Sequence, residues 1–418
     1  MKAGPQWDPE VVDHDNCTDP EHDVIDIVGI SRKVKQKTRD NNNLKGMMDT
    51  MAATNKRIGY VDAAKGILMM IVMLYHIIAT CPLKEFLSGF GGPVVCAFFI
   101  LSGYFFRSGA KSFGENVRRR AKTLMIPFLV YSLVLFAIGA VIHLAKCDQT
   151  PQEVLCCLRN YFGGCIWNRS IQNLFGWDYN NLGKNYMFLA DYWFLLALFM
   201  AEMLFLLIER FALRSPVRGA ICAVLLPAVT GVLLELKISL PYNLHMTPLY
   251  ALLILIGAWA GKTDFPGRLR LPQVWQWIIS ALLFAGVSVL FGALIEPFAT
   301  QIFRGTLGDN AIPKMLLLIA GSSVFGFSLL NMLRLLESNG LKLKVTAWIG
   351  KHSLQFFALH TFFMWLIVQA VNYPLFNTEG QDPKTLVALS LLIFLISVGL
   401  CALYCMISSW IKRRPLKK

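Results

Sequence analysis

The stretch Tyr60–Thr80 reads YVDAAKGILMMIVMLYHIIAT, an apolar run that also carries Asp62, Lys65 and His76. A hydrocarbon layer roughly 30 Å thick is crossed by a helix of about 20 apolar residues. Backbone groups in lipid must be satisfied within their own segment, which excludes isolated strands. This stretch is therefore predicted to be a membrane-spanning helix.

Similar stretches recur along the chain, in which 55% of residues are hydrophobic and 16% charged. Such a composition indicates that lipid is the solvent for most of the chain. The sequence predicts an all-α, polytopic transmembrane helical bundle of about ten spans. Pro227, Pro241 and Pro248 allow the region 219–260 to be divided differently. The predicted spans cover residues 60–80, 90–106, 123–145, 187–208, 219–236, 245–260, 273–294, 312–333, 346–371 and 386–411.

The basic residues indicate how these spans are oriented. With a cytoplasmic N-terminus, the inner segments carry 20 Lys and Arg residues and the outer loops carry nine. Because cytoplasmic loops are enriched in Lys and Arg, both termini are expected in the cytoplasm. The net charge of +14 is accounted for by this asymmetry and by attraction to anionic membrane lipids, so no nucleic-acid partner is expected.

Three regions follow from this pattern. Residues 1–56 are polar, without apolar periodicity, and are expected to be a disordered or loosely attached cytoplasmic tail. A start at Met47, Met48 or Met51 is an alternative, which would remove residues 1–46. Residues 57–411 form the predicted transmembrane domain, and residues 412–418 form a basic cytoplasmic tail.

Four cysteines, Cys147, Cys156, Cys157 and Cys165, cluster in the predicted outer loop 146–186. One or two disulfides are expected there if the loop faces an oxidising compartment. A metal site is not expected, because the spacing lacks a CxxC pair and no His lies in the loop.

Lys65 and His76 are the first candidates for chemistry. Ionisable residues inside a span are costly and usually serve a function. Eleven residues of helix return to nearly the same face, about 16 Å further along the axis. A neutral imidazole can accept the proton of an attacking hydroxyl near neutral pH. Each residue taken alone also has a structural explanation, with Lys65 snorkelling to the interface and His76 packing through a hydrogen bond.

A second group of candidates is basic. Arg107 ends the second span, and Arg118, Arg119, Arg120 and Lys122 follow in a predicted loop before the third. These cations form either a phosphate-binding site or a positive anchor at the inner interface.

Other polar and aromatic residues mark the spans. Ser102 precedes Gly103, a pair that permits close helix approach. Trp193 lies near the outer interface, where Trp and Tyr are ordinary belt residues. Glu202 lies deep in the fourth span and requires a partner or a proton. His360 lies deeper than His352 and is the better functional candidate. No phosphate-binding loop, zinc-protease motif, nucleophile elbow or dinucleotide fingerprint occurs.

At these positions the chain resembles the acyltransferase-3 family of bacterial inner-membrane enzymes, which includes polysaccharide O-acetyltransferases. The family's arginine or lysine is followed by histidine with ten residues between them, and this sequence has lysine where many relatives have arginine. The resemblance covers residues 57 to 411. The matching elements are Lys65 with His76, Phe98–Tyr104 (FFILSGY), Arg120–Pro127 (RAKTLMIP), Trp193–Leu195 (WFL), and Gly350–Leu354 (GKHSL) followed by His360.

The resemblance implies transfer of an acyl group, acetyl by preference, from acyl-CoA to a hydroxyl of a surface polysaccharide or lipid-linked sugar. It places the chain in the bacterial cytoplasmic membrane, with acyl-CoA as substrate and no bound cofactor. It implies His76 and Lys65 as catalytic residues. The implied donor-binding residues are Arg107, Arg118, Arg119, Arg120 and Lys122, and the candidate substrate contacts are Asp62, Ser102, Trp193 and His360.

Two other functions remain open. A transporter or flippase for a lipid-linked saccharide would also bury charge in several spans, although no internal repeat is evident. A catalytically silent scaffold in a polysaccharide assembly complex is the third possibility.

Overall fold

The computed structural model describes residues 59–77, 83–106, 112–146, 149–167, 192–236, 238, 240, 244–291, 311–371 and 382–413. The chain divides into two units, Met1–Arg57 and Ile58–Lys418, and every described residue belongs to the second. The predicted tail, residues 1–56, therefore lies outside the described residues.

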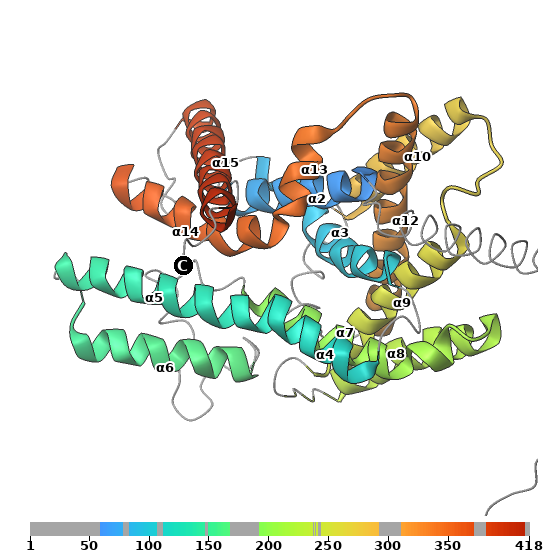
Figure 1. The fold of residues 1–418 in the computed structure, drawn as a ribbon, viewed down its shortest axis with the longest axis horizontal. Coiled ribbons are helices and arrows are strands. Elements are labelled where there is room, and N and C mark those ends of the chain that lie inside the picture. The colour runs from blue at the N-terminus through green and yellow to red at the C-terminus, as the bar shows by residue number, and fades with distance from the viewer. Residues whose placement is uncertain are drawn as a thin grey trace, which may run out of the picture. The chain divides into compact units, whose positions relative to one another are not determined.

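The described part of the chain is helical and contains no strand, which confirms the all-α prediction (Figure 1). A helix lies at each predicted stretch, while the number of membrane crossings and the placement of the termini stay predictions. The elements are α2 (Gly59–Ile77), α3 (Leu83–Tyr104), α4 (Phe113–Arg120), the π-helical segment η2 (Ala121–Met125), α5 (Ile126–Ala145), α6 (Pro151–Trp167), α7 (Trp193–Ala212), α8 (Pro216–Glu235), α9 (Thr247–Thr263), α10 (Gln273–Leu290), α12 (Ala311–Ser338), α13 (Lys344–Lys351), α14 (Ser353–Val371) and α15 (Pro383–Arg413).

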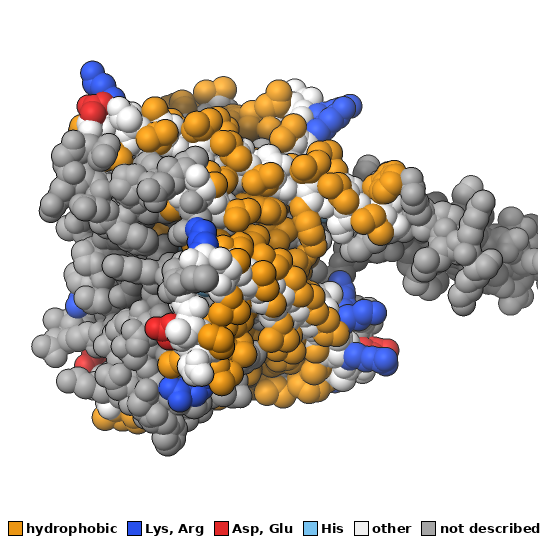
Figure 2. All heavy atoms as spheres, turned by 90° about the vertical axis from the view of Figure 1, so that its left-hand side faces the viewer, with side chains coloured by type: hydrophobic (Ala, Val, Ile, Leu, Met, Phe, Trp, Pro, Cys, Tyr) orange, Lys and Arg blue, Asp and Glu red, His pale blue; other side chains and the backbone are white. Residues whose placement is uncertain are grey.

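Several described helices are suited to lipid. Leucine, isoleucine and valine side chains point outward from α8, α10 and α15, where polar side chains would face outward in a soluble protein. Figure 2 shows one face on which hydrophobic side chains dominate the described surface and charged ones are few. The protein is therefore a multi-pass membrane protein. The five described stretches long and apolar enough to cross a membrane are Phe113–Ala145, Pro216–Glu235, Gln273–Leu290, Ile312–Ser338 and Pro383–Ile411.

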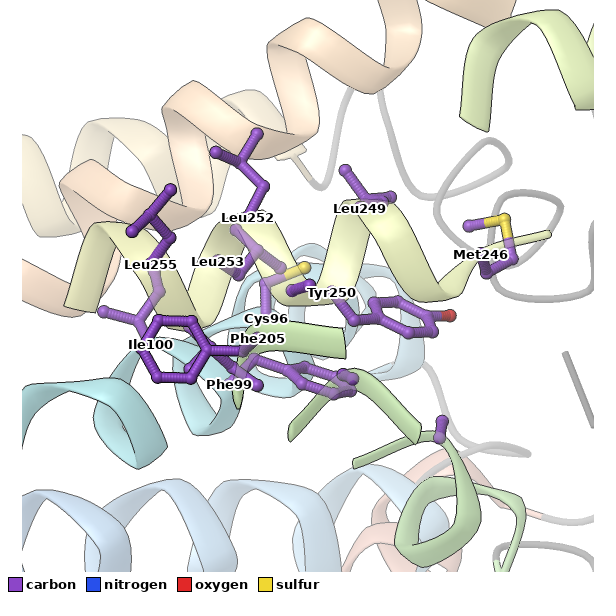
Figure 3. Packing of buried hydrophobic residues seen from close by; sticks show 14 of the residues in the cluster. Cys96, Phe99, Ile100, Phe205, Met246, Leu249, Tyr250, Leu252, Leu253 and Leu255 are labelled. Carbon is purple, nitrogen blue, oxygen red and sulfur yellow. The ribbon is translucent and has the colours of Figure 1, made fainter. Parts of the chain in front are cut away.

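Helix α9 lies in the interior and is buried on nearly all sides from Thr247 to Ala260. Its residues pack against α3 and α7 in a cluster where the Phe99 and Tyr250 rings stack 4.5 Å apart (Figure 3). At Gly257 the backbone oxygen of Ile100 occupies the space that a Cβ atom would need, and at Gly103 the backbone oxygen of Ile254 does the same. A side chain at either glycine would collide with the facing backbone, so these glycines let the two helices approach closely.

Helix α2 makes the same kind of contact with α13, which lies beside it in Figure 1. Gly66 meets the backbone oxygen of Thr346, and Gly350 meets that of Asp62. This contact fixes the part of α2 that carries Lys65. The predicted ninth span, residues 346–371, is not one helix, because the chain leaves helical geometry at His352, with φ −105° and ψ 16°. That prediction is corrected to two helices, α13 and α14.

The prediction for the basic segment before the third span is also corrected. Arg118–Lys122 were predicted in a loop, but the helix already begins at Phe113 and runs through η2 into α5. Ser112 starts it with a capping box, since its hydroxyl accepts from the Glu115 amide at 3.3 Å and the Glu115 carboxylate accepts from the Ser112 amide at 3.0 Å. The arginines therefore sit on a rigid element.

The outer loop 146–186 also contains a helix that was not predicted, α6, which lies beside α5 in Figure 1. Thr150 and Glu153 form its capping box. Hydrogen bonds from the Thr150 amide and hydroxyl lower the pKa of the Glu153 carboxyl from its ordinary value. Cys147 lies outside the described residues, so the predicted disulfides stay a prediction.

Candidate active site

Helix α2 carries both first candidates on one unbroken helix, Gly59–Ile77. Lys65 lies towards its start and is partly exposed, with its Nζ 5.2 Å from the centre of the Phe105 ring. A cation over an aromatic face is attracted by the ring quadrupole. His76 lies in the last turn, about 16 Å further along the axis at 1.5 Å per residue.

The His76 ring has a defined tautomer. Its Nδ1 lies 2.7 Å from the backbone oxygen of Val72. A carbonyl oxygen can only accept a hydrogen bond, so Nδ1 carries the hydrogen. In the neutral ring Nε2 then holds the lone pair that can take a proton. The local bond therefore orients His76 as a base.

His360 of α14 lies against His76, although the two residues are far apart in sequence. The ring centres are 5.2 Å apart and the planes are inclined by 70°. The His360 side chain is fully buried, and its Nδ1 lies 2.8 Å from the oxygen of Phe357 and 3.1 Å from that of Phe356. The structure thus joins two predicted site residues from α2 and α14.

The four basic residues of the α4–η2 region have different surroundings. Arg118, Arg119 and Lys122 are exposed, whereas Arg120 is partly buried. Arg120 Nη1 lies 3.1 Å from Glu202 Oε1 on α7. Arg107, the remaining cation of this predicted set, lies outside the described residues.

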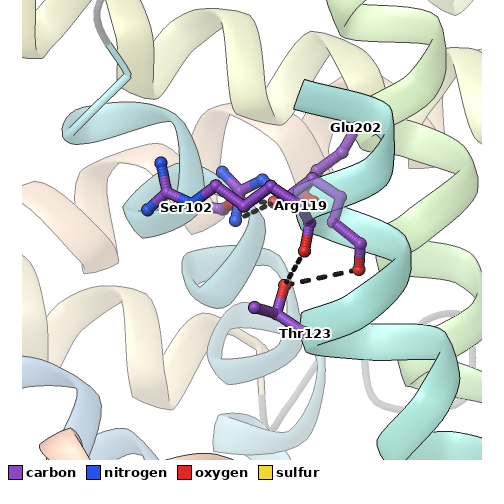
Figure 4. Close-up of polar contacts among 5 residues, drawn as sticks. Ser102, Arg119, Thr123 and Glu202 are labelled. Atoms are coloured by element: carbon purple, nitrogen blue, oxygen red, sulfur yellow. Dashed lines mark hydrogen bonds and ion pairs between the residues drawn. The ribbon is translucent and has the colours of Figure 1, made fainter. Parts of the chain in front are cut away.

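Glu202 is the centre of a polar group between three elements (Figure 4). Its side chain is 3% exposed. Its Oε1 accepts from the Ser102 hydroxyl of α3 at 2.6 Å as well as from Arg120. Lys65 and Arg119 lie within electrostatic reach of the carboxylate. The structure therefore brings Ser102 and Arg120 together at Glu202, a residue that was not among the predicted site residues, and the charge of Lys65 acts on the same carboxylate.

The sequence did contain a signal for Glu202, because a carboxylate deep in a span needs a partner. Its partners were not readable, since Arg120 and Ser102 come from other helices. The hydrogen bond between Ser102 and Glu202 also fixes the orientation of the Ser102 hydroxyl, because its hydrogen points to Glu202. Towards any substrate, the Ser102 oxygen is left as an acceptor.

The other two candidates occupy different surroundings. Asp62 is buried in the first turn of α2, where a negative charge suits the helix dipole. Trp193 begins α7 and packs edge-on to Phe194, with ring centres 6.2 Å apart. Phe194 also contacts Phe357, which lies next to His360. Trp193 is thus linked to the histidine pair through intervening rings.

Tyr192, the residue before Trp193, is buried. It is 1% exposed, so it does not act as a belt residue at the interface. Its hydroxyl donates to the Ala358 carbonyl at 2.5 Å, which ties the start of α7 to α14. A buried tyrosine needs such a partner for its hydroxyl.

Two groups result from this arrangement. One contains Lys65, Ser102, Arg120 and Glu202, and the other contains His76 and His360. Helix α2 connects them, since it contributes Lys65 to the first and His76 to the second. Within the described ranges, no group of three or more His, Cys, Asp and Glu side chains is placed to hold a metal ion.

A family model described as an acyltransferase domain matches residues 58–406. Comparison with curated proteins and with solved structures found no match. The family match covers most of the chain, including both groups around α2, and confirms the resemblance of the motifs. The chain belongs to the acyltransferase-3 family and is a multi-pass membrane acyltransferase.

Proposed function

We propose that this enzyme moves an acetyl group from acetyl-CoA to a hydroxyl of a surface polysaccharide or lipid-linked sugar, with His76 as general base. The observation that carries the proposal is the His76 Nδ1 contact with the Val72 oxygen, which leaves Nε2 as the basic nitrogen. The family supplies the reaction class, acyl transfer. The cytoplasmic membrane of a bacterium is the proposed location.

The proposed reaction is direct transfer. His76 Nε2 takes the proton of the acceptor hydroxyl as its oxygen attacks the thioester carbonyl. The tetrahedral intermediate then collapses, its C–S bond breaks, and the imidazolium returns the proton to the departing thiolate. The products are the sugar ester and free CoA, so the histidine ends the cycle neutral.

The donor's phosphates are proposed to bind at the opposite end of α2. Lys65 and Arg120 are partly buried there, and Arg119 lies close enough to add its charge. In CoA the pantetheine arm separates the phosphates from the thioester, and Lys65 and His76 are separated in the same sense along α2. Arg118 and Lys122 are exposed, which also suits an anchor at the membrane surface.

The acceptor is proposed to lie near the histidine pair. His360 contacts His76 directly, and Trp193 reaches it through Phe194 and Phe357. Asp62 lies in the first turn of α2, and Ser102 of α3 binds Glu202 in the proposed donor group, so their contact with substrate would be with the donor.

The test is the variant His76→Ala in the purified full-length protein, with His352→Ala as the matched control. His352 makes the same local bond, with its Nδ1 2.9 Å from the Trp348 oxygen, but packs against Trp348 instead of a second histidine. We expect His76→Ala to lower CoA release from acetyl-CoA by about 10²–10⁴-fold, the usual contribution of a general base. His352→Ala should retain activity.

Full activity of His76→Ala would refute its role as the base. A wild-type protein that neither binds nor cleaves acetyl-CoA would refute the donor and favour the transporter. The acceptor is then identified by mass spectrometry of the surface glycan from a deletion strain, which should lack one acetyl mass per modified hydroxyl.

A further inference from the structure

The carboxylate of Glu202 makes an incomplete ion pair with Arg120. A carboxylate and a guanidinium can form two parallel hydrogen bonds, yet here both Ser102 and Arg120 contact the same oxygen, Oε1. Within the part of the chain that the structure describes, Oε2 is buried and has no hydrogen-bond partner. A pair serving stability alone would be expected to satisfy both oxygens.

The Arg120 guanidinium also uses only part of its hydrogen-bonding capacity. Its guanidinium has five N–H donors, and among the described residues its side chain contacts Glu202 through Nη1. The side chain is 32% exposed, so the remaining donors can reach a ligand. The charges of Lys65 and Arg119 also act on this carboxylate, so positive charge exceeds negative charge in this group.

We infer that Glu202 is a positioning residue for the donor: it holds Arg120 by one nitrogen so that the rest of the guanidinium faces the phosphates of acyl-CoA. This inference rests on the proposed function. Fixing a long side chain before the ligand arrives removes part of the entropy cost of binding. Ser102 holds Glu202 in turn, so α3, α7 and the α4–η2 helix together place one cation.

The experiment compares two thioesters with Glu202→Gln, a substitution that keeps the size and one acceptor oxygen but removes the charge. Acetyl-CoA carries the phosphates, whereas acetyl-pantetheine has the same thioester without them. We expect the KM for acetyl-CoA to rise about tenfold, as for one weakened charge-assisted hydrogen bond, with kcat unchanged. The KM for acetyl-pantetheine should not change.

The matched control is Glu209→Gln. Glu209 lies on the same helix seven residues later, on nearly the same face, and is also buried, with an oxygen 3.8 Å from Arg210 Nε. Its substitution should leave the KM values of both donors unchanged. Because KM does not depend on the amount of active protein, partial loss of folded material does not obscure the comparison.

A double-mutant cycle provides the second measurement. If Glu202 acts through Arg120, Glu202→Gln should have no further effect on KM in an Arg120→Ala background. An equal rise in KM for both thioesters, no rise for either, or additive effects in the cycle would overturn the inference. Use of acetyl-CoA by the wild type, measured in parallel, shows whether the proposed function itself has failed.

Discussion

At the scale of single residues, three histidines make the same hydrogen bond to the backbone of their own helix but have different neighbours. His76, His352 and His360 each direct Nδ1 to a backbone oxygen four residues earlier. Two of them meet each other across α2 and α14, while His352 lies against Trp348. Because the bond fixes only the tautomer, the neighbour decides which histidine is a candidate for catalysis.

Lys65 gives a prediction at this scale. Lys65→Ala should raise the KM for acetyl-CoA about tenfold, since a partly buried cation near the proposed phosphate site is lost. Lys65→Arg should keep activity, because it retains the charge and can bind phosphate with two nitrogens. Steady-state kinetics of the purified protein measure both. Lys344→Ala, at an exposed lysine of α13, is the control, and an unchanged KM in Lys65→Ala would contradict the donor role.

At the scale of elements, a few neighbouring residues determine where α4 and α6 begin. Ser112 with Glu115 and Thr150 with Glu153 are capping boxes that can be read from the sequence. The prediction missed both helices because it followed the length of apolar stretches. Helix α4 is polar, and the apolar residues of α6 are interrupted by charged and polar ones. The consequence for the site is that Arg120 is held by a helix instead of a loop.

Close packing of α3 and α9 gives a prediction for elements. Gly257→Ala should lower the free energy of unfolding by about 1–3 kcal/mol, because the new methyl group meets the Ile100 backbone and cannot be relieved by a side-chain rotation. Gly286→Ala in α10 is the control. Nothing lies within 4 Å of the added carbon there, so the higher helix propensity of alanine should stabilise by up to about 1 kcal/mol. Thermal unfolding in one detergent compares them, and equal shifts would contradict the packing argument.

At the scale of the whole described unit, some helices lie in the interior and others at the periphery. α9 is buried on nearly all sides, whereas α8, α10 and α15 present apolar side chains outward. The polar groups lie inside. Arg334 of α12 binds Gln276 of α10 at 2.7 Å, and Asn331 donates to Ser280 at 3.0 Å. These polar side chains of α10 and α12 thus satisfy one another across the helix interface.

The orientation of the unit is a prediction at this scale. A fluorescent protein fused after Lys418 should fluoresce, and an alkaline phosphatase fused there should be inactive, because the basic tail is expected in the cytoplasm. Phosphatase fused within residues 168–186 should be active. The opposite pattern would invert the topology and place Lys65 at the outer face, away from cytoplasmic acyl-CoA.

The sequence by itself determined the membrane class, the positions of the main helices and the family, because apolar stretches and motifs are local properties of the chain. It also determined the separation of Lys65 and His76, since both lie on α2 and helix geometry is regular. The helix break at His352 was missed, because the prediction treated residues 346–371 as one span although Gly350 lies two residues before the break.

Only the tertiary structure decided which residues meet. Ser102 and Glu202 are 100 positions apart, and His76 meets His360 from another helix. In a soluble protein an apolar face would show which side of each helix is inward. In lipid both sides are apolar, so the pairing depends on close packing and buried hydrogen bonds that no single helix encodes.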